Sequence, residues 1–120
     1  LLPLAQEGRT VQRGKYYDIR INFCLKNLSS LILSEDKKYI DQIKRFASNV
    51  DIKSRLITWE LAEAKRYALF LLFHEIGHVI YSEHHLQNKL NGPSSKAEEQ
   101  WCDSYSMQKI SELGLMKEHC

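Results

Sequence analysis

Polar and apolar residues alternate over one short segment near the start of the chain. Between residues 17 and 23 the apolar side chains fall on one side, which is formed by Tyr17, Ile19, Ile21 and Phe23. A period of two residues is typical of a half-buried β-strand. Residues 1–14 show little periodicity, so we expect them to be irregular.

Weaker patterns follow this strand. Residues 26–30 contain asparagine and two serines around a single leucine, which favours a turn. The apolar residues 31–33 come next, and we expect them to pair with the first strand as a β-hairpin. Residues 52–57 carry a weak strand pattern, and we expect a further strand there.

Two helices are predicted in the middle of the chain. Ser34 is a suitable N-cap for the first, because two acidic residues follow it and acidic groups stabilise a helix N-terminus. Apolar residues at helical spacing continue this helix to near Asn49. Thr58 is the expected N-cap of the second, much longer helix. Residues 67–80 of that helix are apolar on nearly all sides, so we expect it to be central and buried.

A last helix is predicted after a loop at residues 88–95, where Asn91-Gly92-Pro93 interrupts regular structure. Ser95-Lys96-Ala97-Glu98 is a capping-box sequence that begins this helix, and Gly114 marks its end. A first half rich in strands and a helical second half predict an α+β fold with a small antiparallel or mixed sheet. The length of 120 residues predicts one domain spanning residues 1–120.

The composition is that of an ordinary globular domain, with 43% hydrophobic and 27% charged residues. The net charge of +2 does not indicate a nucleic-acid or membrane partner, and no apolar run is long enough to span a membrane. Three widely spaced cysteines (Cys24, Cys102 and Cys120) do not predict a disulfide framework, which favours a reducing, cytoplasmic compartment. Because the chain begins at Leu1 and carries no signal peptide, we expect a fragment or processed form.

The segment His74-Glu75-Ile76-Gly77-His78 is an H-E-x-x-H motif. Residues four apart lie on one face of a helix, so the two histidines can bind one zinc ion. Glu75 lies beside that face, where it can act as a base toward a water that the metal activates. Gly77 costs about 1 kcal/mol relative to alanine inside a helix, a cost that a closely crossing neighbour would account for.

A catalytic zinc site uses three protein ligands, and the sequence offers three candidates for the third. Glu99 lies early in the capped helix with Asp103 four residues later on the same face. Such a glutamate can bind zinc, and the aspartate can accept the outer N–H of a ligating histidine. His84 has the spacing of the metzincin pattern H-E-x-x-H-x-x-G-x-x-H, but Tyr81 occupies the position where that pattern needs glycine for a sharp turn. Cys102 is the third candidate.

The motif and the segment Glu99-Gln100-Trp101-Cys102-Asp103-Ser104-Tyr105-Ser106 resemble the two-helix core of gluzincin metallopeptidases. The small ImmA/IrrE-type and minigluzincin domains are the most similar, with H-E-hydrophobic-G-H followed by a glutamate helix resembling E-x-E-A-N/D-x-F-A. The resemblance covers about residues 66–110, and Trp101 and Cys102 stand where those domains usually have glutamate and alanine. It implies a zincin-like fold, with a small sheet packed on the motif helix and the glutamate helix.

The resemblance also implies a function. His74, His78 and Glu99 would bind Zn2+, Glu75 would be the general base, and Asp103 would orient a histidine. The expected reaction is hydrolysis of a peptide bond in a peptide or protein substrate, for which ImmA/IrrE-type proteins suggest a transcriptional repressor. Residues 52–57 or 17–23 are expected to hold the substrate by edge pairing. Tyr81, Tyr105 and His85 are candidates for stabilising the oxyanion.

Two other classes of function fit parts of the sequence. The first is a zinc-binding domain without catalysis, acting in regulation or assembly. Glu75 speaks against it, because folding around zinc requires no base. The second is a zincin-like module within a larger nucleic-acid-associated protein. The small net charge and the lack of an aromatic and basic binding pattern speak against that alternative.

Overall fold

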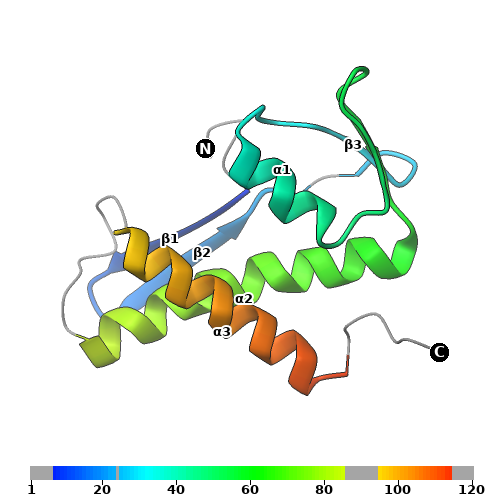
Figure 1. The fold of residues 1–120 in the computed structure, drawn as a ribbon. Coiled ribbons are helices and arrows are strands. Elements are labelled where there is room, and N and C mark those ends of the chain that lie inside the picture. Colours follow the sequence, from blue (N-terminus) through cyan, green and yellow to red (C-terminus); the bar gives the residue numbers. More distant parts are fainter. Residues whose placement is uncertain (1–6, 24, 86–94, 115–120) are drawn as a thin grey trace.

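The structure, a computed structural model, describes residues 7–23, 25–85 and 95–114. Figure 1 shows two small sheets and a short helix on one side of a long helix, which a second long helix crosses. The elements in chain order are β1 Gly8–Arg13, β2 Tyr16–Ile21, β3 Ser29–Leu31, α1 Lys37–Lys44, β4 Asn49–Asp51, β5 Leu56–Thr58, α2 Leu61–His85 and α3 Lys96–Glu112. The fold class is therefore α+β with antiparallel sheets, and no helix among the described residues has the length and apolarity to cross a membrane.

The first sheet is the hairpin of β1 and β2, which packs on α2. Its two-residue turn begins at Gly14, whose φ of 61° lies in the left-handed region that such tight turns use. β2 confirms the strand predicted by the alternation at residues 17–23. The expectation of irregular structure for residues 1–14 is wrong from Gly8 onward. Val11 is the only large apolar residue of β1, so β1 has no alternating pattern that would predict a strand. The strand conformation of β1 therefore depends on its pairing with β2.

The second sheet has the order β3-β5-β4 and is antiparallel throughout. The predicted pairing of residues 31–33 with the first strand is wrong, because β3 pairs with the distant β5. The strand predicted at residues 52–57 begins only at Leu56, since residues 52–55 form the turn from β4. The turn predicted at residues 26–30 is confirmed by reciprocal backbone hydrogen bonds of 3.0 Å between Lys26 and Ser29.

Both helices of the middle segment begin later than predicted. Asp36 rather than Ser34 is the N-cap of α1, and its carboxylate accepts a hydrogen bond of 3.0 Å from the backbone N–H of Lys38. α1 ends before Arg45, well short of the predicted end near Asn49. Helix α2 likewise begins later than predicted, at Leu61. Thr58, its predicted N-cap, is instead the last residue of β5.

The start of α2 is stabilised by a side chain within its first turn. The Glu63 carboxylate accepts hydrogen bonds from the backbone N–H groups of Glu60, at 3.0 Å, and Ser48, at 3.2 Å. The bond from Glu60 caps the N-terminus of α2 in the manner of a capping-box glutamate. The bond from Ser48 joins α2 to the segment that precedes β4.

The prediction that α2 is central and buried is confirmed for one face of the helix, whereas Leu72 is 37% exposed. Tyr67 and Phe70 are at most 1% exposed. They belong to a connected group of aromatic rings contributed by α2, α1's C-terminal end and the loops beside the sheets: Phe23, Phe46, Trp59, Tyr67 and Phe70. This packing buries the first half of α2, while the second half carries the motif beside the β1–β2 hairpin.

Ser95 is the N-cap of α3, as predicted, and its hydroxyl accepts a hydrogen bond of 3.1 Å from the backbone N–H of Glu98. α3 crosses α2 at Gly77, where a Cβ atom would lie 3.3 Å from the Cα, Cβ and Sγ atoms of Cys102. This close crossing accounts for a glycine within the motif. Cys102 is buried, as expected, whereas Cys24, Cys120 and the predicted break at residues 91–93 lie outside the described residues.

Candidate metal centre

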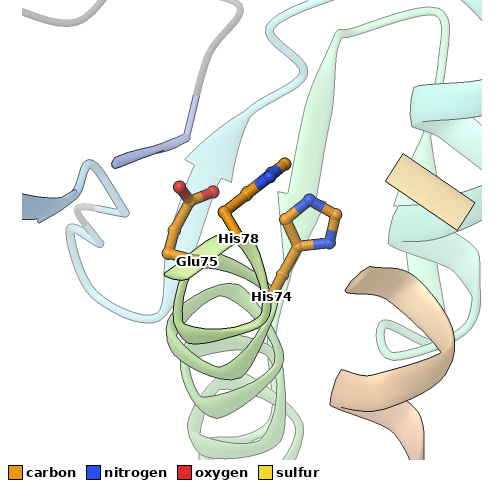
Figure 2. Close-up of side chains that lie close together, drawn as sticks. All are labelled: His74, Glu75 and His78. Atoms are coloured by element: carbon orange, nitrogen blue, oxygen red, sulfur yellow. The ribbon is translucent and has the colours of Figure 1, made fainter. Parts of the chain in front are cut away.

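Helix α2 presents the three polar side chains of the motif together. Figure 2 shows His74, Glu75 and His78 rising from the same side of the helix. Each offers one ligand atom, and these three atoms lie within 4.8 Å of one another. The arrangement follows from helix geometry, because residues four apart share a face and the residue after the first of them lies beside it.

Glu99 of α3 brings a second carboxylate to the two histidines. Its Oε1 atom lies 3.1 Å from Nε2 of His74, and its Oε2 atom lies 3.1 Å from Nε2 of His78. Burial alone would raise the pKa of Glu99, but the hydrogen bonds to both histidines outweigh burial and hold that pKa well below its usual range. One ionised carboxylate therefore faces both Nε2 atoms.

The outer nitrogen of each histidine also faces a carboxylate. Oε2 of Glu98 lies 2.6 Å from Nδ1 of His78, and Oδ1 of Asp103 lies 3.0 Å from Nδ1 of His74. The Asp103 contact has the distance of an ion pair but not the angle of a hydrogen bond. Among the buried side-chain nitrogen and oxygen atoms of the described ranges, only Nδ1 of His74 lacks a hydrogen-bond partner. The guanidinium of Arg45 lies 3.6 Å from the other oxygen of Asp103.

These carboxylates change the acidity of the histidines. Burial would lower the pKa of His74, but the contacts with Asp103 and Glu99 raise it to about 9. Burial likewise opposes the positive charge on His78, whereas its contacts with Cys102, Glu99 and Glu98 raise the pKa to about 11. The carboxylates thus attract positive charge to the space around the two Nε2 atoms, an electrostatic environment that also favours a bound cation.

Glu75 lies beside this set of contacts and is hydrogen-bonded to β1. Its side chain is 5% exposed, and Oε1 accepts a hydrogen bond of 2.8 Å from the Thr10 hydroxyl of β1. Burial raises the pKa of Glu75, an effect that the Thr10 hydrogen bond and the nearby histidines oppose. Glu99, and not Glu75, is the carboxylate in contact with both Nε2 atoms, so the geometry favours Glu99 as the ligand and leaves Glu75 free to act as a base.

The two other candidates for the third ligand are placed less favourably. α2 continues without interruption past Tyr81, and His84 is exposed on its surface. The sharp turn that would direct His84 back to the other histidines is therefore missing from α2. The Cys102 thiol does contact His78, but burial raises its pKa, and a thiol that stays protonated is a poor metal ligand.

The candidates for stabilising an oxyanion occupy other roles or are not described. Tyr81 packs edge-on against Trp101, with ring centroids 5.6 Å apart, and Tyr105 stacks on Trp101 with ring centroids 5.5 Å apart. The side chain of His85 lies outside the described part of the chain.

Sequence reasoning missed two residues of this centre, Glu98 and Thr10. Glu98 has the position of a capping-box glutamate, and its carboxylate contacts His78. A glutamate adjacent to a proposed ligand is a signal that could have suggested a role at the site. Thr10 had no signal in the sequence, because the strand that carries it was not predicted.

The donor set formed by two imidazole nitrogens and one carboxylate oxygen is one that zinc favours in catalytic sites. The carboxylates on the outer nitrogens fit as well, because groups of this kind fix the orientation of zinc-ligating histidines. The residues His74, His78 and Glu99 therefore fit a zinc ion. The chain matches no protein-family model, no curated protein and no solved structure.

Proposed function

We propose that this chain is a zinc-dependent peptidase domain with a gluzincin-type, zincin-like arrangement of its two long helices. The observation that carries the proposal is the placement of Glu99, whose two oxygens lie 3.1 Å from Nε2 of His74 and from Nε2 of His78. Two histidines of one helix and a glutamate of the next are the ligand set of a catalytic zinc site. Glu75 supplies a second carboxylate beside that set.

Each residue has a separate role in this proposal. His74, His78 and Glu99 hold the ion, and Glu98 and Asp103 keep the histidine rings turned so that Nε2 faces Glu99. Zinc in such a site acts as a Lewis acid and supplies a nucleophilic water at neutral pH. The carboxylate of Glu75 accepts a proton from the attacking water and delivers it to the nitrogen of the leaving amine.

The sheets limit where an extended peptide substrate can pair. β5 is the middle strand of its sheet, so residues 52–57 cannot offer a free edge as predicted. The hairpin of β1 and β2 packs on the half of α2 that carries the motif, and it has only two strands. We therefore place the substrate alongside this hairpin, where backbone pairing would bring a peptide bond toward Glu75.

Metal analysis and a peptidase assay test this proposal together. The purified protein should contain about one zinc per chain and cleave fluorogenic peptides from a mixed-sequence library. Glu75→Gln should retain zinc and lose at least about 100-fold in turnover, because the general base is removed. Glu60→Gln is the matched control, since it changes an exposed glutamate directly before the same helix. Absence of zinc binding, or full activity in Glu75→Gln, would contradict the proposal.

A zinc-binding domain without catalysis is the second candidate, and the burial of Glu75 favours it. A side chain that is 5% exposed and bonded to Thr10 also fits a purely structural carboxylate. This alternative predicts full zinc occupancy without cleavage of any library peptide. It further predicts that Glu75→Gln weakens folding, because a buried hydrogen-bonded carboxylate is replaced.

A further inference from the structure

The carboxylate of Glu75 contacts a residue 65 positions away in the sequence. The hydroxyl of Thr10, in the middle of β1, lies 2.8 Å from Oε1 of Glu75 and 3.1 Å from its backbone oxygen. Thr10 is 7% exposed and Glu75 is 5% exposed, so water competes little for this hydrogen bond. A hydroxyl has one proton to donate, and the shorter distance directs it to the carboxylate.

The position of the Thr10 hydroxyl is itself well determined. Thr10 lies opposite Ile19 in the register of the hairpin, which fixes the backbone of β1 at this point. Threonine is branched at Cβ and has restricted rotation about χ1. The donor is therefore held by the sheet and not by the flexible end of a long side chain.

Gly8 lies two residues before Thr10, on the same face of β1. A Cβ atom at Gly8 would lie 2.6 Å from Oε2 of Glu75 and 3.1 Å from its Cδ and Cγ atoms. Because Oε1 is held by Thr10, the carboxylate has little freedom to move away from such an atom. The absence of a side chain at Gly8 thus lets the Glu75 carboxylate pack directly against β1 without a clash.

We propose that β1 positions the general base, with Thr10 holding Oε1 of Glu75 and Gly8 providing the room in which the carboxylate keeps this position. This inference rests on the proposed peptidase function. In the proton transfer, an O–H bond of the attacking water breaks as Oε2–H forms. Oε2–H then breaks as the leaving nitrogen gains the proton, so Glu75 ends in its starting state. Thr10 is a positioning residue in this scheme, since it acts through Glu75.

Three substitutions on β1 test the inference. Thr10→Val keeps the shape of the side chain but removes the donor, and it should lower kcat roughly 10- to 100-fold with little change in KM, the size of effect that misplacement of a reacting group causes. Thr10→Ser keeps the donor and should restore kcat to within about threefold of the wild type. Thr58→Val, the same chemical change at an exposed threonine of β5 outside the hairpin, is the matched control and should retain wild-type kcat.

Zinc affinity, measured by competition with a chromophoric chelator, provides a readout that does not depend on activity. Thr10→Val should bind zinc as tightly as the wild type, because the histidines and Glu99 are not altered. Gly8→Ala should also retain zinc and lose kcat. If Thr10→Val keeps kcat within twofold, or if Thr10→Ser is as impaired as Thr10→Val, the inference is wrong. Loss of zinc or of folded protein in Thr10→Val would show a structural role and also overturn it.

Glu75→Gln distinguishes failure of this inference from failure of the proposed function. If Glu75→Gln is inactive while Thr10→Val has full kcat, Glu75 is the base and β1 does not position it. If Glu75→Gln remains fully active, the proposed function itself fails and the inference fails with it.

Discussion

Oε2 of Glu98 lies 2.6 Å from Nδ1 of His78, at the point where α3 crosses the motif helix. The Glu98 side chain is 1% exposed, and the His78 side chain is 8% exposed. Glutamate is almost never fully buried unless it is paired. A buried carboxylate on the outer nitrogen therefore fixes the orientation of the His78 ring and leaves Nε2 directed at Glu99.

Replacing Glu98 should weaken metal binding although Glu98 is not itself a proposed ligand. Glu98→Gln keeps the size of the side chain and removes its charge. We expect zinc affinity to fall about 10- to 100-fold, which is the usual effect of losing a carboxylate that orients a metal-binding histidine. Competition with a chromophoric chelator measures this. Gln100→Ala, an exposed change in the same turn of α3, should have wild-type affinity. Equal affinities for the two variants would show that Glu98 does not orient His78.

Removing the third ligand should separate the three candidates. Glu99→Ala removes the carboxylate between the two Nε2 atoms, so we expect the bound zinc to be lost on dialysis. His84→Ala and Cys102→Ala should retain about one zinc per chain by elemental analysis, because three other ligands remain. Full zinc occupancy in Glu99→Ala, together with loss in either other variant, would identify a different ligand set.

Adding a methyl group to Gly77 should destabilise the protein. Alanine favours a helix by about 1 kcal/mol over glycine, but the new Cβ atom would lie 3.3 Å from the backbone and side chain of Cys102. Cys102 is 0% exposed and cannot move without separating α2 from α3. We expect a net loss of about 1–3 kcal/mol, typical of overpacking, in urea unfolding. Ser104→Ala on the exposed face of α3 should have little effect.

A buried acid at the start of β1 should make stability depend on pH. Burial raises the pKa of Glu7 from 4.5 to about 7, although the Tyr67 hydroxyl bonds to it. The folded state therefore holds this proton more tightly than the unfolded state. Its contribution is complete below pH 4.5, declines as the pH rises through 7, and amounts to about 3 kcal/mol at 1.4 kcal/mol per pKa unit.

Glu7→Gln tests this dependence directly. Glutamine stays neutral, so the variant should be less sensitive to pH between 4.5 and 7, and above pH 7 it should be more stable than the wild type by about 3 kcal/mol. Urea unfolding at pH 5 and pH 8 measures both quantities. Glu112→Gln changes a glutamate whose side chain is 51% exposed and should leave the pH profile unchanged. A wild-type profile in Glu7→Gln would show that the Glu7 proton does not contribute.

The elements predicted correctly are those with strong local signals. The alternation from Tyr17 predicts β2, the long apolar run around Tyr67 predicts a buried helix, and Ser95 predicts the start of α3. The errors concern segments whose conformation depends on distant partners. β1 has little pattern of its own and exists through its pairing with β2, and the residues of β3 pair with residues of β5 that lie 25 or more positions away in sequence.

The same distinction applies to the candidate site. The sequence by itself determined that His74, Glu75 and His78 come together, because helix geometry places such residues on one side. Only the tertiary structure decided that Glu99 faces both histidines, that Glu98 lies behind His78 and that Thr10 binds Glu75. Neighbouring residues on a helix are separated by about 100°, so which of two adjacent glutamates faces each nitrogen depends on how α3 crosses α2. That crossing is set by packing across Gly77 and Cys102, which no local pattern contains.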